Sequence, residues 1–189
     1  MMPMGEPMAR PSSRPRLIEA ALTVVEEGGI TALTLDAVAE EAGVTKRGLL
    51  YHFPTKHALL TGIHEDLAAR IEQELLDATG KEPEAASLVE RTRGYVRAAL
   101  KAPSNVEMRL IMEAANEPEW IAPWERVYRR WFPEARLSIE ELDDLSLRCL
   151  VARMAADGSW AHESTLASPL SEEARERLAG KILNVLDGE

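Results

Sequence analysis

Apolar side chains recur three and four residues apart along most of the chain, the spacing that predicts amphipathic α-helices. One such stripe covers residues 17–25 and ends at Gly28, and a second covers residues 35–42 and ends at Gly43. Few runs show the strict alternation of apolar and polar residues that β-strands require. The pattern therefore predicts an all-α protein of about nine helices.

The same period continues through the rest of the chain, which we expect to form a long helix from about Thr55 to Gly80 and four or five further helices. One of these is a short helix from Pro123 to Trp131. Ser138 and Glu141 have the spacing of a capping box, which predicts the start of another long helix.

That long helix is expected to have two apolar faces, so that one face packs on the protein's own core and the other on a different partner. The first face contains positions 147, 150, 151, 154, 155 and 158, and the second contains Leu142, Leu145, Cys149, Ala152 and Ala156. The last helix has an apolar stripe that includes Leu178, Ile182 and Val185.

Residues 34–53 combine an amphipathic helix, a glycine turn and a second short helix, which is the spacing of a DNA-reading helix-turn-helix. Thr34 and Thr45 are suitable N-caps for the two helices. Leu49 and Phe53, one turn apart, anchor the second helix inward, which places its basic N-terminal end outward for entry into the major groove. The outward-facing residues are then Lys46, Arg47, Gly48, Tyr51 and His52.

The run LTLDAVAEEAGVTKRGLLYHFPTKHALL, preceded by LIEAALTVVEEGGI, resembles the N-terminal domain of the TetR family of one-component repressors over about residues 14–62. The resemblance implies that Thr34 and Thr45 cap their helices at DNA phosphates and that Tyr51, His52 and Lys56 hold the DNA backbone. It also implies that Lys46, Arg47 and Gly48 face base edges. Leu50, where an aromatic residue is frequent, and His57, where an acidic one is usual, depart from the family pattern.

A narrower resemblance is carried by GLLYHFPTKHALLTGIHEDLA and MAADGSWAHE. These phrases are similar to actinobacterial repressors that sense cationic, lipophilic drugs and control a multidrug efflux pump. The expected organisation is a flexible basic arm (1–13), the DNA-binding domain (14–62) and an effector-binding and dimerisation domain (63–189).

The dimer implied by the family is a four-helix bundle made by the last two helices of each subunit, and its two-fold symmetry predicts a near-palindromic operator. The interface candidates are Leu142, Leu145, Cys149, Ala152, Ala156, Leu178, Ile182 and Val185.

Three of the four tryptophans lie close together in the sequence, beside methionines, and such side chains suit a pocket for flat apolar ligands. A carboxylate such as Glu113 or Asp157 could pair with a ligand cation. The alternative is that these residues are simply core. The pocket candidates are Met108, Met112, Glu113, Asn116, Trp120, Trp124, Trp131, Met154 and Trp160.

Taken as a sum, the formal charge of −10 argues against a nucleic-acid partner. The distribution of the charged residues along the chain changes this interpretation. Nearly all of the excess acid lies beyond residue 60. The stretches Arg10–Arg16 and Thr45–Lys56 each hold three basic residues and no acid, which indicates a local anion-binding face.

Other classes of function find little support in the sequence. The four histidines lack metal-ligand spacing, there is no glycine-rich phosphate loop, and we expect neither catalysis nor a metal or cofactor. The chain has no apolar run long enough to cross a membrane and no secretory signal, and its single cysteine fits a reducing cytoplasm. A redox-sensing regulator that uses Cys149 and a metabolite-sensing repressor remain the alternatives.

Overall fold

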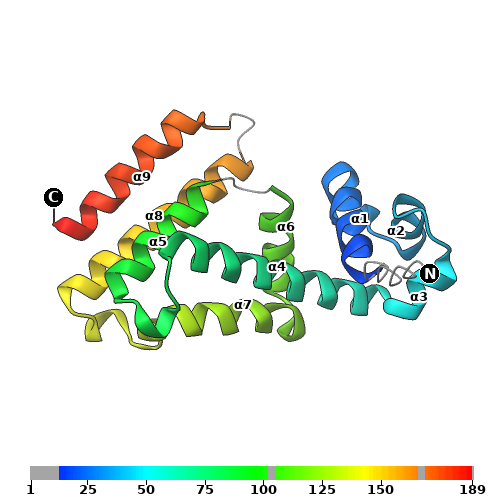
Figure 1. The fold of residues 1–189 in the computed structure, drawn as a ribbon, viewed down its shortest axis with the longest axis horizontal. Coiled ribbons are helices and arrows are strands. Elements are labelled where there is room, and N and C mark those ends of the chain that lie inside the picture. Colours follow the sequence, from blue (N-terminus) through cyan, green and yellow to red (C-terminus); the bar gives the residue numbers. More distant parts are fainter. Residues whose placement is uncertain (1–12, 102–104, 166–168, 189) are drawn as a thin grey trace, which may run out of the picture. The chain divides into compact units, whose positions relative to one another are not determined.

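The computed structural model describes residues 13–101, 105–165 and 169–188, and over these ranges it contains nine α-helices, four short 3₁₀ helices and no strand (Figure 1). This confirms the predicted all-α class. None of the helices in the described ranges is long and apolar enough to span a membrane. The chain divides into two compact units, residues 1–59 and 60–189. The expected basic arm lies outside the described residues, apart from Ser13.

The first unit is built from α1 (Ser13–Gly28), the 3₁₀ turn η1 (Ile30–Ala32), α2 (Leu35–Glu41) and α3 (Lys46–His52). Gly43 joins α2 to α3 with φ of 62°, a left-handed conformation that glycine adopts without steric cost. Because α1 begins at Ser13, Arg14 belongs to a helix, and its guanidinium lies 5.4 Å from the centre of the Phe53 ring.

Helix α4 (Lys56–Thr79) runs over the predicted range and crosses the boundary between the units as one continuous helix. Its first turn is capped by Thr55, whose Oγ1 accepts a hydrogen bond from the Ala58 N–H at 3.0 Å. The second unit continues with η2 (Pro83–Ala85), α5 (Leu88–Lys101), α6 (Asn105–Ala114), α7 (Pro118–Trp131), η3 (Pro133–Arg136), η4 (Ile139–Glu141), α8 (Asp144–Thr165) and α9 (Glu172–Asp187).

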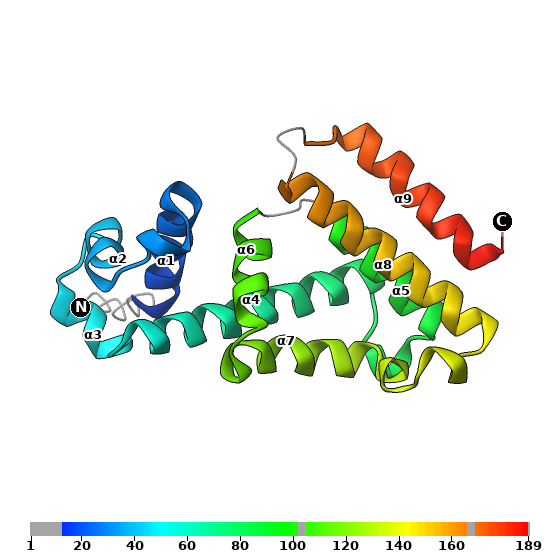
Figure 2. The same ribbon diagram turned by 180° about the vertical axis from the view of Figure 1, so that it is seen from behind.

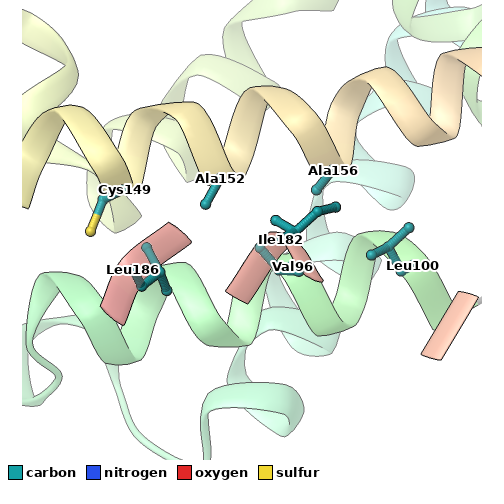
Figure 3. Close-up of a cluster of buried hydrophobic side chains, with 7 residues drawn as sticks. All are labelled: Val96, Leu100, Cys149, Ala152, Ala156, Ile182 and Leu186. Atoms are coloured by element: carbon teal, nitrogen blue, oxygen red, sulfur yellow. The ribbon is translucent and has the colours of Figure 1, made fainter. Parts of the chain in front are cut away.

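Helices α5, α8 and α9 pack side by side, as both ribbon views show (Figures 1 and 2). Their shared core contains Val96 and Leu100 from α5, Cys149, Ala152 and Ala156 from α8, and Ile182 and Leu186 from α9 (Figure 3). The residues that α8 contributes to this core all have small side chains.

Two predicted helix starts are wrong. Helix α7 begins at Pro118, and Pro123 lies inside it, because proline is favoured in the first turn of a helix and the earlier proline takes that position. The Ser138–Glu141 capping box forms, with the Ser138 N–H bonded to Glu141 Oε2 at 2.7 Å, but it opens only η4. Helix α8 starts later, where Asp143 Oδ1 accepts the Ser146 N–H at 2.7 Å.

Candidate DNA-binding and effector sites

The short helix α3 is fixed by a cap at its start and by apolar anchors on its inner face. Thr45 Oγ1 accepts the Gly48 N–H at 3.1 Å, and Thr34 caps α2 in the same way through the Ala37 N–H, also at 3.1 Å. Leu49 is completely buried, as predicted for the inward face. The cap satisfies a backbone N–H group at the start of α3 that has no partner within the helix.

Every predicted DNA-contact residue is at the surface of the first unit or of the first turn of α4. Tyr51 is 85% exposed and contacts the His52 ring edge-on, with centroids 5.1 Å apart. His52 is half-buried, and the other candidates are exposed: Thr34, Thr45, Lys46, Arg47, Gly48 and Lys56. The structure therefore leaves these positions accessible to DNA.

Lys46 has a partner that the sequence did not reveal. Its Nζ lies 2.9 Å from Asp36 Oδ2 on α2, and both side chains are mostly exposed. The two residues are ten positions apart on different helices, so no helical spacing rule could have paired them. Asp36 thus places a negative charge beside the expected DNA-facing surface.

The second unit contains a cavity of about 860 Å³, within the usual range for ligand pockets. Helices α4 to α8 all contribute to its wall, together with the segment after α7. The lining residues are Ile71, Leu75, Tyr95, Met108, Ile111, Ile121, Trp124, Glu125, Val127, Tyr128, Arg129, Trp131, Phe132, Arg136, Asp157 and Trp160. The wall is mostly apolar and aromatic, as expected for a lipophilic ligand.

Some of the predicted pocket residues line this cavity and others do not. Met108, Trp124, Trp131 and Trp160 are in its wall, together with Asp157. The following candidates lie outside the lining set: Met112, Glu113, Asn116, Trp120 and Met154. Met112 and Met154 are 67% and 63% exposed, because their positions on α6 and α8 face away from the core.

The sequence did not identify the contributions of α4 and α5. Ile71 and Leu75 lie on the long helix expected from about Thr55 to Gly80, and only the packing of α4 beside the cavity makes them wall residues. Tyr95 donates a hydrogen bond from its hydroxyl to Asp157 Oδ1 at 2.5 Å. Burial raises the pKa of the Asp157 carboxyl, with the Tyr95 hydrogen bond opposing that shift.

Trp120 and Trp124 meet His64, a fully buried histidine of α4. The Trp124 indole N–H donates to His64 Nδ1 at 3.2 Å, and the imidazole stacks on the Trp120 ring at a centroid distance of 5.7 Å. Burial lowers the pKa of His64 to about 4, so the ring is neutral at physiological pH. A wall residue of the cavity is therefore hydrogen-bonded directly to α4.

A second hollow of about 490 Å³ lies against α7 and is lined by Ala122, Glu125, Arg126, Arg129, Arg130 and Arg136. Arg130 is held by Glu72, Glu82 and Glu84 at 2.7–2.8 Å. Arg129 pairs with Glu125 at 2.7 Å.

The prediction that the second apolar face of α8 meets a partner subunit is wrong for three of its residues. Cys149, Ala152 and Ala156 are completely buried against α5 and α9, and Ile182 is buried with them. Leu145, at 39% exposure, and the half-buried Leu142, Leu178 and Val185 are more accessible. Besides Leu145, the large apolar side chains that α8 leaves exposed are Leu147, Val151 and Met154, from the face that had been expected to pack on the core.

Among the described residues, no group of three or more histidine, cysteine, aspartate or glutamate side chains is placed to hold a metal ion. Cys149 is buried, and its burial raises the pKa of the thiol, which disfavours the reactive thiolate.

An exposed, capped helix-turn-helix unit defines a DNA-binding protein. Residues 17–63 match the family model described as "Bacterial regulatory proteins, tetR family", and residues 89–187 match "Tetracyclin repressor-like, C-terminal domain". The chain belongs to the TetR family of bacterial transcriptional regulators. This family consists of DNA-binding regulators and not of enzymes.

Among characterised relatives, the chain is similar to the HTH-type transcriptional repressor KstR of Rhodococcus jostii, with 30% identity over 159 residues that cover 79% of this chain and 70% of the relative. Its fold is similar to that of a putative regulator from Saccharomonospora viridis in complex with choline, with a TM-score of 0.68, 16% identity, and 94% and 97% of the two chains covered. It is also similar to that of the multidrug binding protein EbrR complexed with malachite green, with a TM-score of 0.58, 23% identity, and 91% and 98% covered.

Proposed function

We propose that this regulator is a homodimeric repressor that binds a near-palindromic operator and leaves it when a small lipophilic effector occupies the 860 Å³ cavity. The observation that carries the proposal is the cavity itself, which has a mostly apolar, aromatic wall and a ligand-like volume. A protein that acts on operator DNA in this way works in the cytoplasm.

Helix α4 is the proposed carrier of the effector signal. It contributes Ile71 and Leu75 to the cavity wall, it receives the Trp124 hydrogen bond through His64, and its first residue is the DNA-contact candidate Lys56. An effector acts only if it binds the state that cannot hold DNA more tightly than the state that can. Occupation of the cavity is proposed to shift α4 and so change the separation of the two recognition helices.

For the dimer, we propose an interface on α8 and α9 centred on Leu147, Val151 and Met154. These large apolar side chains are 38%, 46% and 63% exposed, and they recur at helical spacing on one face. Sedimentation of the pure protein at micromolar concentration should give the dimer mass, and Val151→Glu should give a monomer. A monomeric wild type would contradict the proposal.

The test of the whole function begins with DNA selected by the pure protein from a random pool. Operator binding by anisotropy is then measured against a panel of lipophilic compounds, with quenching of tryptophan fluorescence as the sign of cavity occupation. A compound that quenches and releases DNA supports the proposal. If no compound in a wide panel releases operator, the effector role is wrong.

A cavity-filling variant separates effector binding from DNA binding. Ile121→Trp places a large ring in the cavity, so we expect normal operator affinity and a loss of effector response. The matched control is Ile139→Trp, because Ile139 is 63% exposed and outside the cavity wall. An unchanged response in Ile121→Trp would show that the effector binds elsewhere.

The genes under control are proposed to include an efflux transporter for lipophilic compounds. The basis is the similarity of two segments, Gly48–Ala68 and Met154–Glu163, to repressors that control a multidrug efflux pump. A metabolite-sensing repressor is the second candidate, and the similarity to KstR, itself a transcriptional repressor, is consistent with either. The position of the selected operator, beside a transporter gene or beside metabolic genes, distinguishes the two candidates.

The buried, protonated thiol of Cys149 disfavours the alternative of a redox-sensing regulator. Release of DNA by an oxidant, abolished by Cys149→Ser, would support that alternative.

A further inference from the structure

The effector cavity and the arginine-lined hollow adjoin each other. They share three lining residues, Glu125, Arg129 and Arg136. The cavity side is apolar and aromatic, whereas the second hollow is lined by four arginines and one glutamate. A molecule that occupied both would pass from an apolar to a cationic environment.

Two of the four arginines in the hollow are already neutralised by the protein. Arg129 pairs with Glu125, and Arg130 is surrounded by three glutamates. Arg126 and Arg136 are exposed and have no ion pair within the described ranges. Arg126 and Arg136 are therefore the two arginines of the hollow that no described carboxylate pairs with.

Two residues in or beside the cavity wall, Trp131 and Arg153, have buried hydrogen-bond donors without acceptors among the described residues. The indole N–H of Trp131 is buried and unpartnered among the described residues. Arg153, only 4% exposed, places its guanidinium 4.0 Å from the centre of the Phe132 ring in the wall, and its Nε and Nη1 lack acceptors in the described part of the chain. These N–H groups lie beneath the wall surface, so they would add positive potential near a ligand without bonding to it directly.

Burial raises the pKa of two carboxyl groups in the same region. Asp157 accepts the Tyr95 hydroxyl, and burial raises the pKa of its carboxyl. Burial, reinforced by the neighbouring Glu74, also raises the pKa of Glu107, which lines a small adjoining hollow. Burial therefore makes the charged form of each of these carboxyls more costly than it is in water.

We propose that the effector is an amphipathic carboxylate, whose apolar body fills the aromatic cavity and whose anionic head lies at Arg126 and Arg136. This inference rests on the proposed function, in which the cavity receives the effector. It replaces the lipophilic cation expected from the sequence with an anion, because Arg126 and Arg136 line the hollow beside the apolar cavity and have no ion pair among the described residues.

The test uses three compounds that share one alkyl chain and differ in head charge: dodecanoate, its methyl ester and dodecyltrimethylammonium, each below its micelle concentration. Binding is followed by tryptophan fluorescence and by operator release. Dodecanoate should bind about tenfold more tightly than the ester, as one charge-assisted contact would give. The preference should fall at high salt, because the arginines are exposed.

Variants test the position of the head group. Arg126→Gln combined with Arg136→Gln should lower dodecanoate affinity to that of the ester and leave ester binding unchanged. The matched control is Arg97→Gln, which removes an exposed arginine of α5 outside both hollows. Thermal unfolding should be unchanged in all of these variants.

The outcomes separate this inference from the proposed function. Equal binding of the three compounds, tighter binding of the ammonium compound, or no binding of dodecanoate overturns the carboxylate effector. If a neutral or cationic compound releases operator, the effector-released repressor stands and only the ligand class is wrong. If dodecanoate binds with the expected preference but neither it nor any other compound of the panel releases DNA, the ligand class stands and the proposed function fails.

Discussion

Asp36→Asn is the sharpest test of the DNA-binding surface, because it frees Lys46 without changing any predicted contact residue. The Lys46 Nζ to Asp36 Oδ2 distance is 2.9 Å, and the two side chains are 54% and 72% exposed. Ion pairs this exposed contribute about 0.2–1 kcal/mol, and the loss of a carboxylate from the first turn of α2 costs about 0.3–1 kcal/mol. The free protein should therefore become slightly less stable.

DNA binding should change in the opposite direction. A freed Lys46 can neutralise one phosphate, and one additional phosphate contact steepens the slope of log affinity against log salt by about 0.9. The Lys46–Asp36 ion pair contributes at most about 1 kcal/mol to the free protein. Removing the need to break it on DNA binding therefore raises operator affinity by up to about fivefold at low salt. Fluorescence anisotropy on the selected operator at several salt concentrations measures both quantities.

The control is Glu26→Gln, which removes one exposed acid from α1 in the same unit and leaves Lys46 paired. It should change affinity less than Asp36→Asn does, and it should leave the salt slope unchanged. If Asp36→Asn binds operator no more tightly than the wild type, with an unchanged slope, then Lys46 does not contact DNA and the assignment of this surface is refuted.

Three further predictions test the site and its scaffold. Arg47→Ala should reduce the discrimination between operator and altered base sequences, by about 1–3 kcal/mol if its contact is bidentate. Lys56→Ala should instead weaken binding to operator and to random DNA by the same factor. Competition binding measures both effects, and equal losses on all sequences for both variants would contradict the assignments. Gly94→Ala should cost about 1–3 kcal/mol of unfolding free energy, because its Cβ would clash with the Thr79 side chain; Thr79→Ala in the same chain should recover part of the loss, and an unchanged melting temperature would contradict the packing. Burial lowers the pKa of His64 to about 4 in the folded state, so its contribution to the free energy of unfolding is complete above pH 6.5 and is lost as the pH falls towards 4. His64→Gln should flatten this part of a plot of stability against pH. An unchanged profile would disprove the shift.

The helices and the helix-turn-helix were predictable because their signals are local. Thr34, Thr45 and Gly43 act within one turn of chain through caps and a left-handed turn, so their roles do not depend on distant residues. The start of α7 was missed because Pro118 and Pro123 are both acceptable near a helix start, and local preference alone does not rank them.

The effector site was only partly predictable. Met108, Trp124, Trp131, Asp157 and Trp160 were identified by their chemistry, and they do line the cavity. Chemistry could not exclude Met112 or Met154, since a soft apolar side chain has the same composition whether it faces a cavity or solvent. The wall residues of α4 and α5 carried no distinguishing signal at all.

The sequence by itself therefore determined the class of fold, the positions of most helices and the DNA-reading motif, because hydrophobic period, caps and turns are properties of neighbouring residues. Only the tertiary structure decided which face of α8 is buried and that Asp36 pairs with Lys46. It also decided that the apolar wall of the cavity and the arginine-lined hollow adjoin each other. Each of these depends on how helices distant in the chain pack together, and an amphipathic pattern states that a face must be covered without stating what covers it.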